Sequence, residues 1–174
     1  RDQPRSRGLG DVYKRQIYTN LHTNTAYSSL AAQVTKIFPI TLNTFIIPTI
    51  YGRFIFNDGI PFMYSNVIGG EGYNPHYEQQ IPFSGLTHTE STLKLLGNAQ
   101  IQVRHKFHEK QYLTLSGNYA IHQNQFSNFL QGKKIYGTSI GYGYDSPLGP
   151  IEGFICYSNR TNKLGFYLNI GFGF

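Results

Sequence analysis

One motif in the sequence could support covalent catalysis. Residues 137–141 read GTSIG and match the G-x-S-x-G pattern, in which a serine hydroxyl attacks an acyl group. In hydrolases with this motif, the serine sits on a sharp turn between a strand and a helix. Here the motif lies within an alternating, strand-like segment, and the residues that follow, YGYDSPLGP, have no helical periodicity. We therefore predict no catalytic role for Ser139.

Two other short segments imitate elements of a patatin-type lipase. The sequence NDGI contains Asp58-Gly59, and IGGEG contains the glycine pair Gly69-Gly70. The order in that family is a glycine-rich loop, then the serine, then the aspartate. In this chain the aspartate comes first and the serine last, so we predict no catalytic residue among them.

The histidines and the cysteine, which could bind a metal ion, do not have the spacing of a metal site. The six histidines form neither an H-x-x-x-H nor an H-E-x-x-H pattern, since they lie at positions 22, 76, 88, 105, 108 and 122. His105 and His108 are three residues apart, which places them on opposite faces of a strand. The single cysteine, Cys156, excludes an internal disulfide framework and a cysteine-rich metal site. We predict no metal and no cofactor.

The first 16 residues, RDQPRSRGLGDVYKRQ, resemble a translated sequencing adapter. Residues 11–16 back-translate to GAT GTG TAT AAG AGA CAG, as in transposase-based library preparation, and residues 6–10 continue into the same adapter. We therefore assign residues 1–16 to an artefact and exclude them from fold reasoning. They carry five of the 15 basic and two of the nine acidic residues, so the net charge falls from +6 to +3. This weak basic balance gives no reason to expect nucleic acid as a partner. The chain from Ile17 is predicted to be a C-terminal piece of a longer protein.

The remaining chain alternates with a period of two residues, which is typical of β-strands. The final segment, KLGFYLNIGFGF, places leucine, isoleucine and phenylalanine on one face and mostly glycine and asparagine on the other. Six earlier segments follow the same pattern, at residues 30–38, 45–56, 98–107, 112–122, 135–145 and 150–159. Pro48 lies inside the second of these, where a proline suits an edge, a bulge or a strand end. The sequence therefore predicts an all-β fold of seven strands.

Strand length and composition favour a membrane barrel over a water-soluble sandwich. Several segments reach the roughly 9–11 residues that a tilted membrane strand needs. Charged residues make up 14% of the chain, below the roughly 25% typical of soluble domains. The last five strands have short connections, whereas residues 57–90 form one long loop, as in barrels with short periplasmic turns and longer outer loops. Bacterial barrels take an even number of strands from 8 upward. We predict an antiparallel up-and-down transmembrane β-barrel, truncated to its C-terminal part at residues 30–174, with residues 17–29 unassigned.

The last strand resembles the C-terminal signal of outer-membrane barrels. Its apolar face carries large side chains at every second position, namely Phe166, Leu168, Ile170, Phe172 and Phe174. The resemblance implies that the barrel-assembly machinery binds this strand and that outer-membrane lipids surround it. The implied location is the outer membrane of a Gram-negative bacterium.

A more specific resemblance covers most of the chain from about Leu30. Residues 141–174, GYGYDSPLGPIEGFICYSNRTNKLGFYLNIGFGF, and residues 47–85, which include IGGE, are similar to the C-terminal region of patatin-like phospholipases of the Bacteroidota type. The SPLGPIE turn is shared more widely with the outer-membrane assembly and two-partner secretion superfamily. The resemblance implies a parent that hydrolyses lipid acyl esters with a Ser–Asp dyad in an N-terminal domain outside this chain.

The same resemblance suggests a role for the long loop. In the related assembly proteins this loop folds back into the barrel lumen, so Gly69, Gly70 and Glu71 are expected to contact the inner wall. Arg104 is the expected partner of Glu71, because arginine pairs with carboxylates through two hydrogen bonds. A mobile outer loop is the alternative.

Four functions are compared, of which the first is the predicted one and the others are alternatives. The first is a barrel fragment that anchors a patatin-like phospholipase and does no chemistry itself. The second is the barrel of an outer-membrane assembly or two-partner secretion transporter. The third is a soluble β-sandwich or lipocalin-like binding module, whose outward faces would be unusually poor in charge. The fourth is a small serine hydrolase that uses Ser139.

Overall fold

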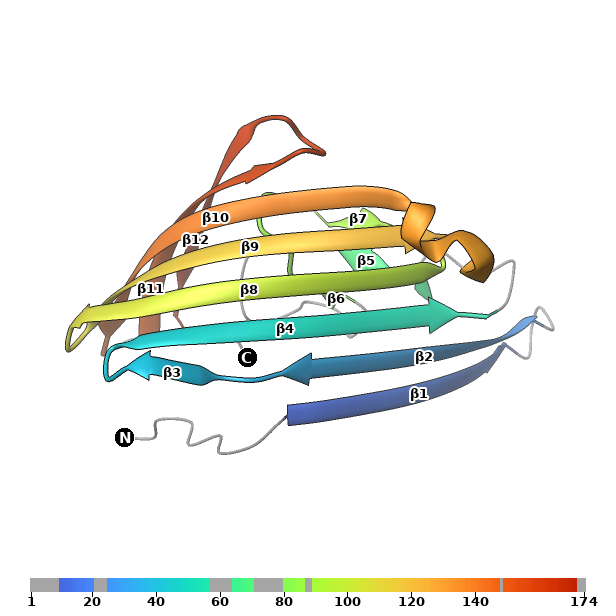
Figure 1. The fold of residues 1–174 in the computed structure, drawn as a ribbon, viewed down its shortest axis with the longest axis horizontal. Helices are drawn as coiled ribbons and strands as arrows, with labels where there is room; N and C mark the ends of the chain where they lie inside the picture. The colour runs from blue at the N-terminus through green and yellow to red at the C-terminus, as the bar shows by residue number, and fades with distance from the viewer. Residues whose placement is uncertain are drawn as a thin grey trace.

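The main feature of the fold is a curved antiparallel sheet. The structure is a computed structural model, and it describes residues 10–20, 25–56, 64–70, 80–86, 89–147 and 149–171. Its strand order is β1-β2-β4-β8-β9-β10-β11-β12, with β3 paired to β4. The strands are β1 (Gly10–Asn20), β2 (Thr25–Thr35), β3 (Phe38–Thr41), β4 (Thr44–Ile55), β8 (Leu95–His108), β9 (Gln111–Gln123), β10 (Lys133–Ser146), β11 (Gly149–Ser158) and β12 (Leu164–Ile170). Neighbours in sequence are neighbours in the sheet, as in an up-and-down meander (Figure 1).

The seven strands predicted from the sequence are all present, so the antiparallel all-β prediction is confirmed. The described strands form an open sheet whose path ends at β1 and β12, and they do not close into a barrel. β1 and the first part of β2 add residues that the sequence analysis left out or unassigned. β1 pairs with β2 from Gly10 to Asn20. This pairing does not test whether the native gene encodes residues 1–16, so their adapter origin stays a prediction.

Pro48 marks an irregularity in the sheet. β2 and β3 both pair with β4, and they are separated by residues 36–37. At this break, the backbone N–H of Lys36 donates to the carbonyl oxygen of Pro48 at 3.2 Å. Proline has no N–H to donate, so it fits beside an interruption in the neighbouring strand. The sequence suggested an edge, a bulge or a strand end here, and the structure has an interruption.

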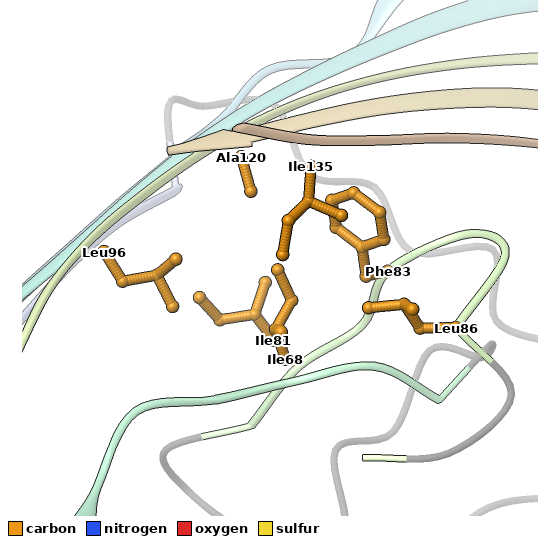
Figure 2. Close-up of a cluster of buried hydrophobic side chains, with 7 residues drawn as sticks. All are labelled: Ile68, Ile81, Phe83, Leu86, Leu96, Ala120 and Ile135. Atoms are coloured by element: carbon orange, nitrogen blue, oxygen red, sulfur yellow. The ribbon is translucent and has the colours of Figure 1, made fainter. Parts of the chain in front are cut away.

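A second, smaller sheet packs on one face of the main sheet. Its strands are β5 (Val67–Ile68), β6 (Gln80–Ile81) and β7 (Glu90–Ser91), in the order β6-β5-β7. The main sheet curves around it (Figure 1). We call the face that it contacts the inner face and the opposite face the outer face. Figure 2 shows the apolar cluster between the two layers, formed by Ile68, Ile81, Phe83 and Leu86 of the loop and by Leu96, Ala120 and Ile135 of the main sheet.

The two faces of the main sheet have an inverted distribution of polarity. On β9 the buried, inner-facing residues are Tyr112, Thr114, Ser116, Asn118, Ala120 and His122, whereas Leu113, Leu115 and Tyr119 are exposed on the outer face. On β11, Glu152 and Ser158 are buried while Ile151 and Ile155 are exposed. A soluble sheet buries its apolar face in the core. An exposed apolar face over a buried polar face is the arrangement of a membrane barrel wall.

Candidate functional site: the inner face and the loop packed on it

Three serine hydroxyl groups join the loop to the inner face. Ser84 Oγ lies 2.9 Å from Ser116 Oγ of β9 and 3.3 Å from Ser139 Oγ of β10, and the last two are 2.6 Å apart. All three side chains are buried. Each hydroxyl can donate and accept, so the trio satisfies its own hydrogen bonds without water. Ser139 therefore lies mid-strand in a hydroxyl cluster, and the GTSIG motif is continuous strand rather than a strand–turn–helix.

Two glycines permit the loop to approach the sheet this closely. A Cβ atom on Gly137 of β10 would collide with the carbonyl oxygen of Ser84. A Cβ on Gly85 would collide with the carbonyl oxygen of Tyr157, and Gly85 also has a φ of 88°, which side chains disfavour. The segment around residues 84–85 thus lies directly against the backbones of β10 and β11.

Gly69 and Gly70 are located where the loop turns beside the apolar cluster. Both have positive φ angles, 120° and 77°. The N–H of Gly69 donates to the carbonyl of Ile81 at 3.0 Å, and the N–H of Gly70 donates to that of Leu86 at 2.7 Å. Gln80 Nε2 donates to the carbonyl of Gly69 at 2.8 Å. The glycine pair therefore ties the separate parts of the loop to one another and holds Ile68 against the sheet.

A buried arginine fixes the start of the loop. Arg53, at the end of β4, is 4% exposed, and its Nη1 donates to Asn66 Oδ1 at 3.0 Å. Asn66 Nδ2 in turn donates to the carbonyls of Leu93 and Lys94 at 2.9 and 2.8 Å. Asn66 thus links the end of β4 to the residues just before β8. Arg53 was not predicted from the sequence, because one charged residue in an apolar strand gives no signal of its partner.

A polar belt crosses the inner face at the end where the short turns lie. Tyr112 of β9 donates its hydroxyl to Glu152 Oε1 of β11 at 2.7 Å, and Arg104 Nη2 of β8 lies 3.5 Å from the same oxygen. The Arg104 guanidinium also lies 4.5 Å from the centroid of the Tyr112 ring. Asn169 of β12 donates to Glu152 Oε2 at 3.5 Å. One carboxylate, 2% exposed, therefore connects four strands.

This belt gives Arg104 a partner other than the one expected. Its carboxylate partner in the described part of the chain is Glu152 of β11. Glu71 lies outside the described residues, so the Arg104–Glu71 pair stays a prediction. Glu152 and Tyr112 were missed by the sequence analysis. Each lies shortly after a short turn, at an inner-facing position of its strand. Counting residues from the turns would have predicted that the two side chains lie at the same height on the inner face.

The remaining sequence candidates lie elsewhere. Phe166, Leu168 and Ile170 are exposed on the outer face of β12, and Phe172 and Phe174 lie outside the described residues. His105 Nδ1 is 2.9 Å from Thr44 Oγ1 on the outer face. Among the described residues, no group of three or more His, Cys, Asp or Glu side chains is arranged to hold a metal ion.

The chain was compared with models of known protein families. The model of the OMP85 superfamily matches residues 12–174. The chain belongs to the OMP85 superfamily. Neither the curated proteins nor the solved structures contain a match to it.

Membership of the OMP85 superfamily agrees with the inverted polarity of the sheet, and it places the chain among outer-membrane β-barrel proteins of the assembly and transport type. The predicted relation to that superfamily is confirmed. The match does not extend to a patatin-like phospholipase or to a Bacteroidota source. In the described part of this OMP85 chain, no helix is long and apolar enough to cross a membrane.

Proposed function

We propose that this chain forms part of the wall and the inner loop of an outer-membrane barrel that assembles or secretes other proteins. The observation that carries the proposal is the inverted polarity of the sheet, together with a loop that packs on the inner face. Lipid would cover the exposed apolar residues such as Leu115 and Ile155, because the bilayer leaves only the lumen for polar side chains. Outer-membrane lipids are therefore its first partner.

The inner face has two zones that fit a gated passage. At the end of the sheet where β4 connects to β8, residues of that connection cover the inner face through the apolar cluster and the serine trio. Towards the short turns, Gln100, Gln102, Arg104 and Lys106 of β8 are only partly buried. In a closed barrel these residues would line a polar vestibule, and displacement of the loop would open it to the other side.

The C-terminal strand is the proposed contact for the barrel-assembly machinery. Phe166, Leu168 and Ile170 form an exposed apolar row on β12, which is the last strand of the described sheet. An unpaired strand edge in a bilayer is costly, since its backbone groups have no water to bind. Further strands from the rest of the protein would pair there and close the barrel.

An anchor for a patatin-like phospholipase is the second candidate. It is supported by the similarity of residues 47–85 and 141–174 to the C-terminal region of those enzymes. In that case hydrolysis would take place in a domain outside this chain, and the barrel would hold the enzyme at the membrane.

Sequencing the gene upstream of the Ile17 codon separates the two candidates. Transport-associated repeats before the barrel would support the assembly or secretion function. A domain with a glycine-rich loop, then a G-x-S-x-G motif that opens a helix, then Asp-Gly would contradict it and support the phospholipase anchor.

A further inference from the structure

The connection between β9 and β10 folds over the outer face of the sheet. It contains the 3₁₀ helix η2 (Phe126–Gln131), drawn as the orange coil in Figure 1. Gly97 of β8 points to the outer face, and a Cβ built on it would lie 3.0 Å from Cζ of Phe129. The ring of Phe54, which is on the same face, lies 6.1 Å from that of Phe129 and 5.8 Å from that of Phe126. In a membrane barrel, this helix would lie beside lipid rather than above the lumen.

The outward side of this segment is apolar and unusually exposed. Phe126 is 58% exposed and Leu130 75%, and no residue of η2 is buried. The ring of Phe56 stacks on Phe126 with centroids 6.0 Å apart. Surface apolar clusters of this kind mark contact with a partner or a membrane. Membrane barrels carry girdles of aromatic side chains at both of their interfaces with water.

Basic side chains stand directly next to this apolar surface. Lys133 and Lys134 follow η2 in the sequence and are exposed, and Lys134 shares the outer face with Tyr136. In the next turn at this end of the sheet, Arg160 and Lys163 are also exposed. Among the described residues at this end of the sheet, the acidic side chain is that of Glu90, and its Oε2 lies 3.1 Å from Nε of Arg160. Lys134 therefore presents charge toward whatever covers the aromatic cluster, whereas Lys133 is in register with the inner-facing His122 and lies on the other side of the sheet.

We propose that η2 and Lys134 form a binding surface for anionic lipid headgroups, an inference that rests on the proposed barrel function. Phe126 and Leu130 insert among the upper acyl chains, and the Lys134 ammonium group binds a lipid phosphate. The position on the outer face is what favours lipid over a soluble acidic partner. That face is apolar along β8, β9 and β10, so a bilayer already covers it up to the level of η2.

A single tryptophan can report on this surface, because the chain contains none. The Phe126→Trp protein, with the full chain, is reconstituted in phosphatidylcholine vesicles with and without phosphatidylglycerol. Lipids brominated near the headgroup should quench the introduced indole more than lipids brominated deep in the acyl chain. Raising the phosphatidylglycerol fraction should shift the indole emission, and the fraction at half-shift measures the affinity of the surface for the anionic headgroup. Replacing Lys134 (K134Q) should weaken that affinity about fivefold at low salt. High salt should weaken it as well.

Two controls separate this surface from general charge effects and from the barrel itself. The K110Q protein has the same charge change in a turn at the other end of the strands and should alter the affinity read by the Phe126→Trp reporter less than twofold. An equal loss in the K134Q and K110Q proteins would overturn the lysine site. Ile155→Trp, on the outer face of β11, should be quenched by deep bromines. If the Ile155→Trp protein is quenched and the Phe126→Trp protein is not, the headgroup surface is wrong while the barrel function stands. If neither is quenched, both fail.

Discussion

The hydroxyl of Tyr112 donates to the carboxylate of Glu152 at 2.7 Å, although strand β10 lies between their two strands. The contact passes over Gly143, where a Cβ atom would collide with the tyrosine ring. A glycine in the middle strand therefore lets two distant strands meet through their side chains. This relationship links the glycine-rich inner face of β10 to the polar belt.

Substitution of Gly143 by alanine should destabilise the folded chain. The added methyl group meets the Tyr112 ring, and overpacking of this kind costs about 1–3 kcal/mol. The matched control is Gly117→Ala on the outer face, where a Cβ would meet nothing within 4 Å. Urea unfolding in detergent micelles measures both. Equal stability of the two variants would contradict the close approach over Gly143.

Tyr112 and Glu152 should be energetically coupled. Hydrogen bonds to charged groups contribute about 1.5–3 kcal/mol. Tyr112→Phe and Glu152→Gln should each lower the free energy of unfolding, and the double variant should lose less than the sum of the two. The same unfolding measurement completes the cycle. Strict additivity would show that the two side chains do not bind each other in the folded protein.

A disulfide should form between the loop and the inner face. Ser84 Oγ and Ser116 Oγ are 2.9 Å apart, so S84C/S116C in a Cys156→Ala background places two thiols within reach of each other. Oxidation should change the mobility of the protein on a non-reducing gel. S84C/T138C is the control, because Thr138 is exposed on the outer face, with the sheet between it and Ser84. If only the control pair cross-links, the loop does not pack on the inner face.

Adjacent residues of β11 should face different surroundings in a bilayer. Phe154 is 4% exposed and faces inward, whereas Ile155 is 53% exposed and faces outward. Single tryptophans at these positions, in lipids brominated in the acyl chain, should give strong quenching for Ile155→Trp and little for Phe154→Trp. The reverse order would mean that the apolar face is not the lipid face.

The native gene should not encode RDQPRSRGLGDVYKRQ. Amplification outward from the codons of Leu30, followed by sequencing, should show a different sequence before Ile17. If the adapter-like residues are found in frame in genomic DNA, residues 10–16 of β1 are native and the basic segment must be reconsidered as part of the protein.

Local pattern decided much of this fold. Alternation of residues such as Leu113, Leu115 and Tyr119 with Thr114, Ser116 and Asn118 fixed which side chains share a face, because successive residues of a strand point to opposite sides. Short turns then fixed the order of the last five strands. The same pattern showed that Ser139 lies within a strand, so the sequence was enough to exclude the strand–turn–helix setting of a hydrolase serine.

Only the tertiary structure decided which distant residues meet. Glu152 as a partner of Arg104, the Ser84–Ser116–Ser139 trio and the packing of Phe129 on Gly97 all join segments that are far apart in the sequence. Each depends on the register between strands and on the path of a loop, and a shift of one residue would turn every side chain to the other face. The sequence by itself determined the two faces of the sheet. What lies on each face was set by long-range packing, which a period-two pattern does not encode.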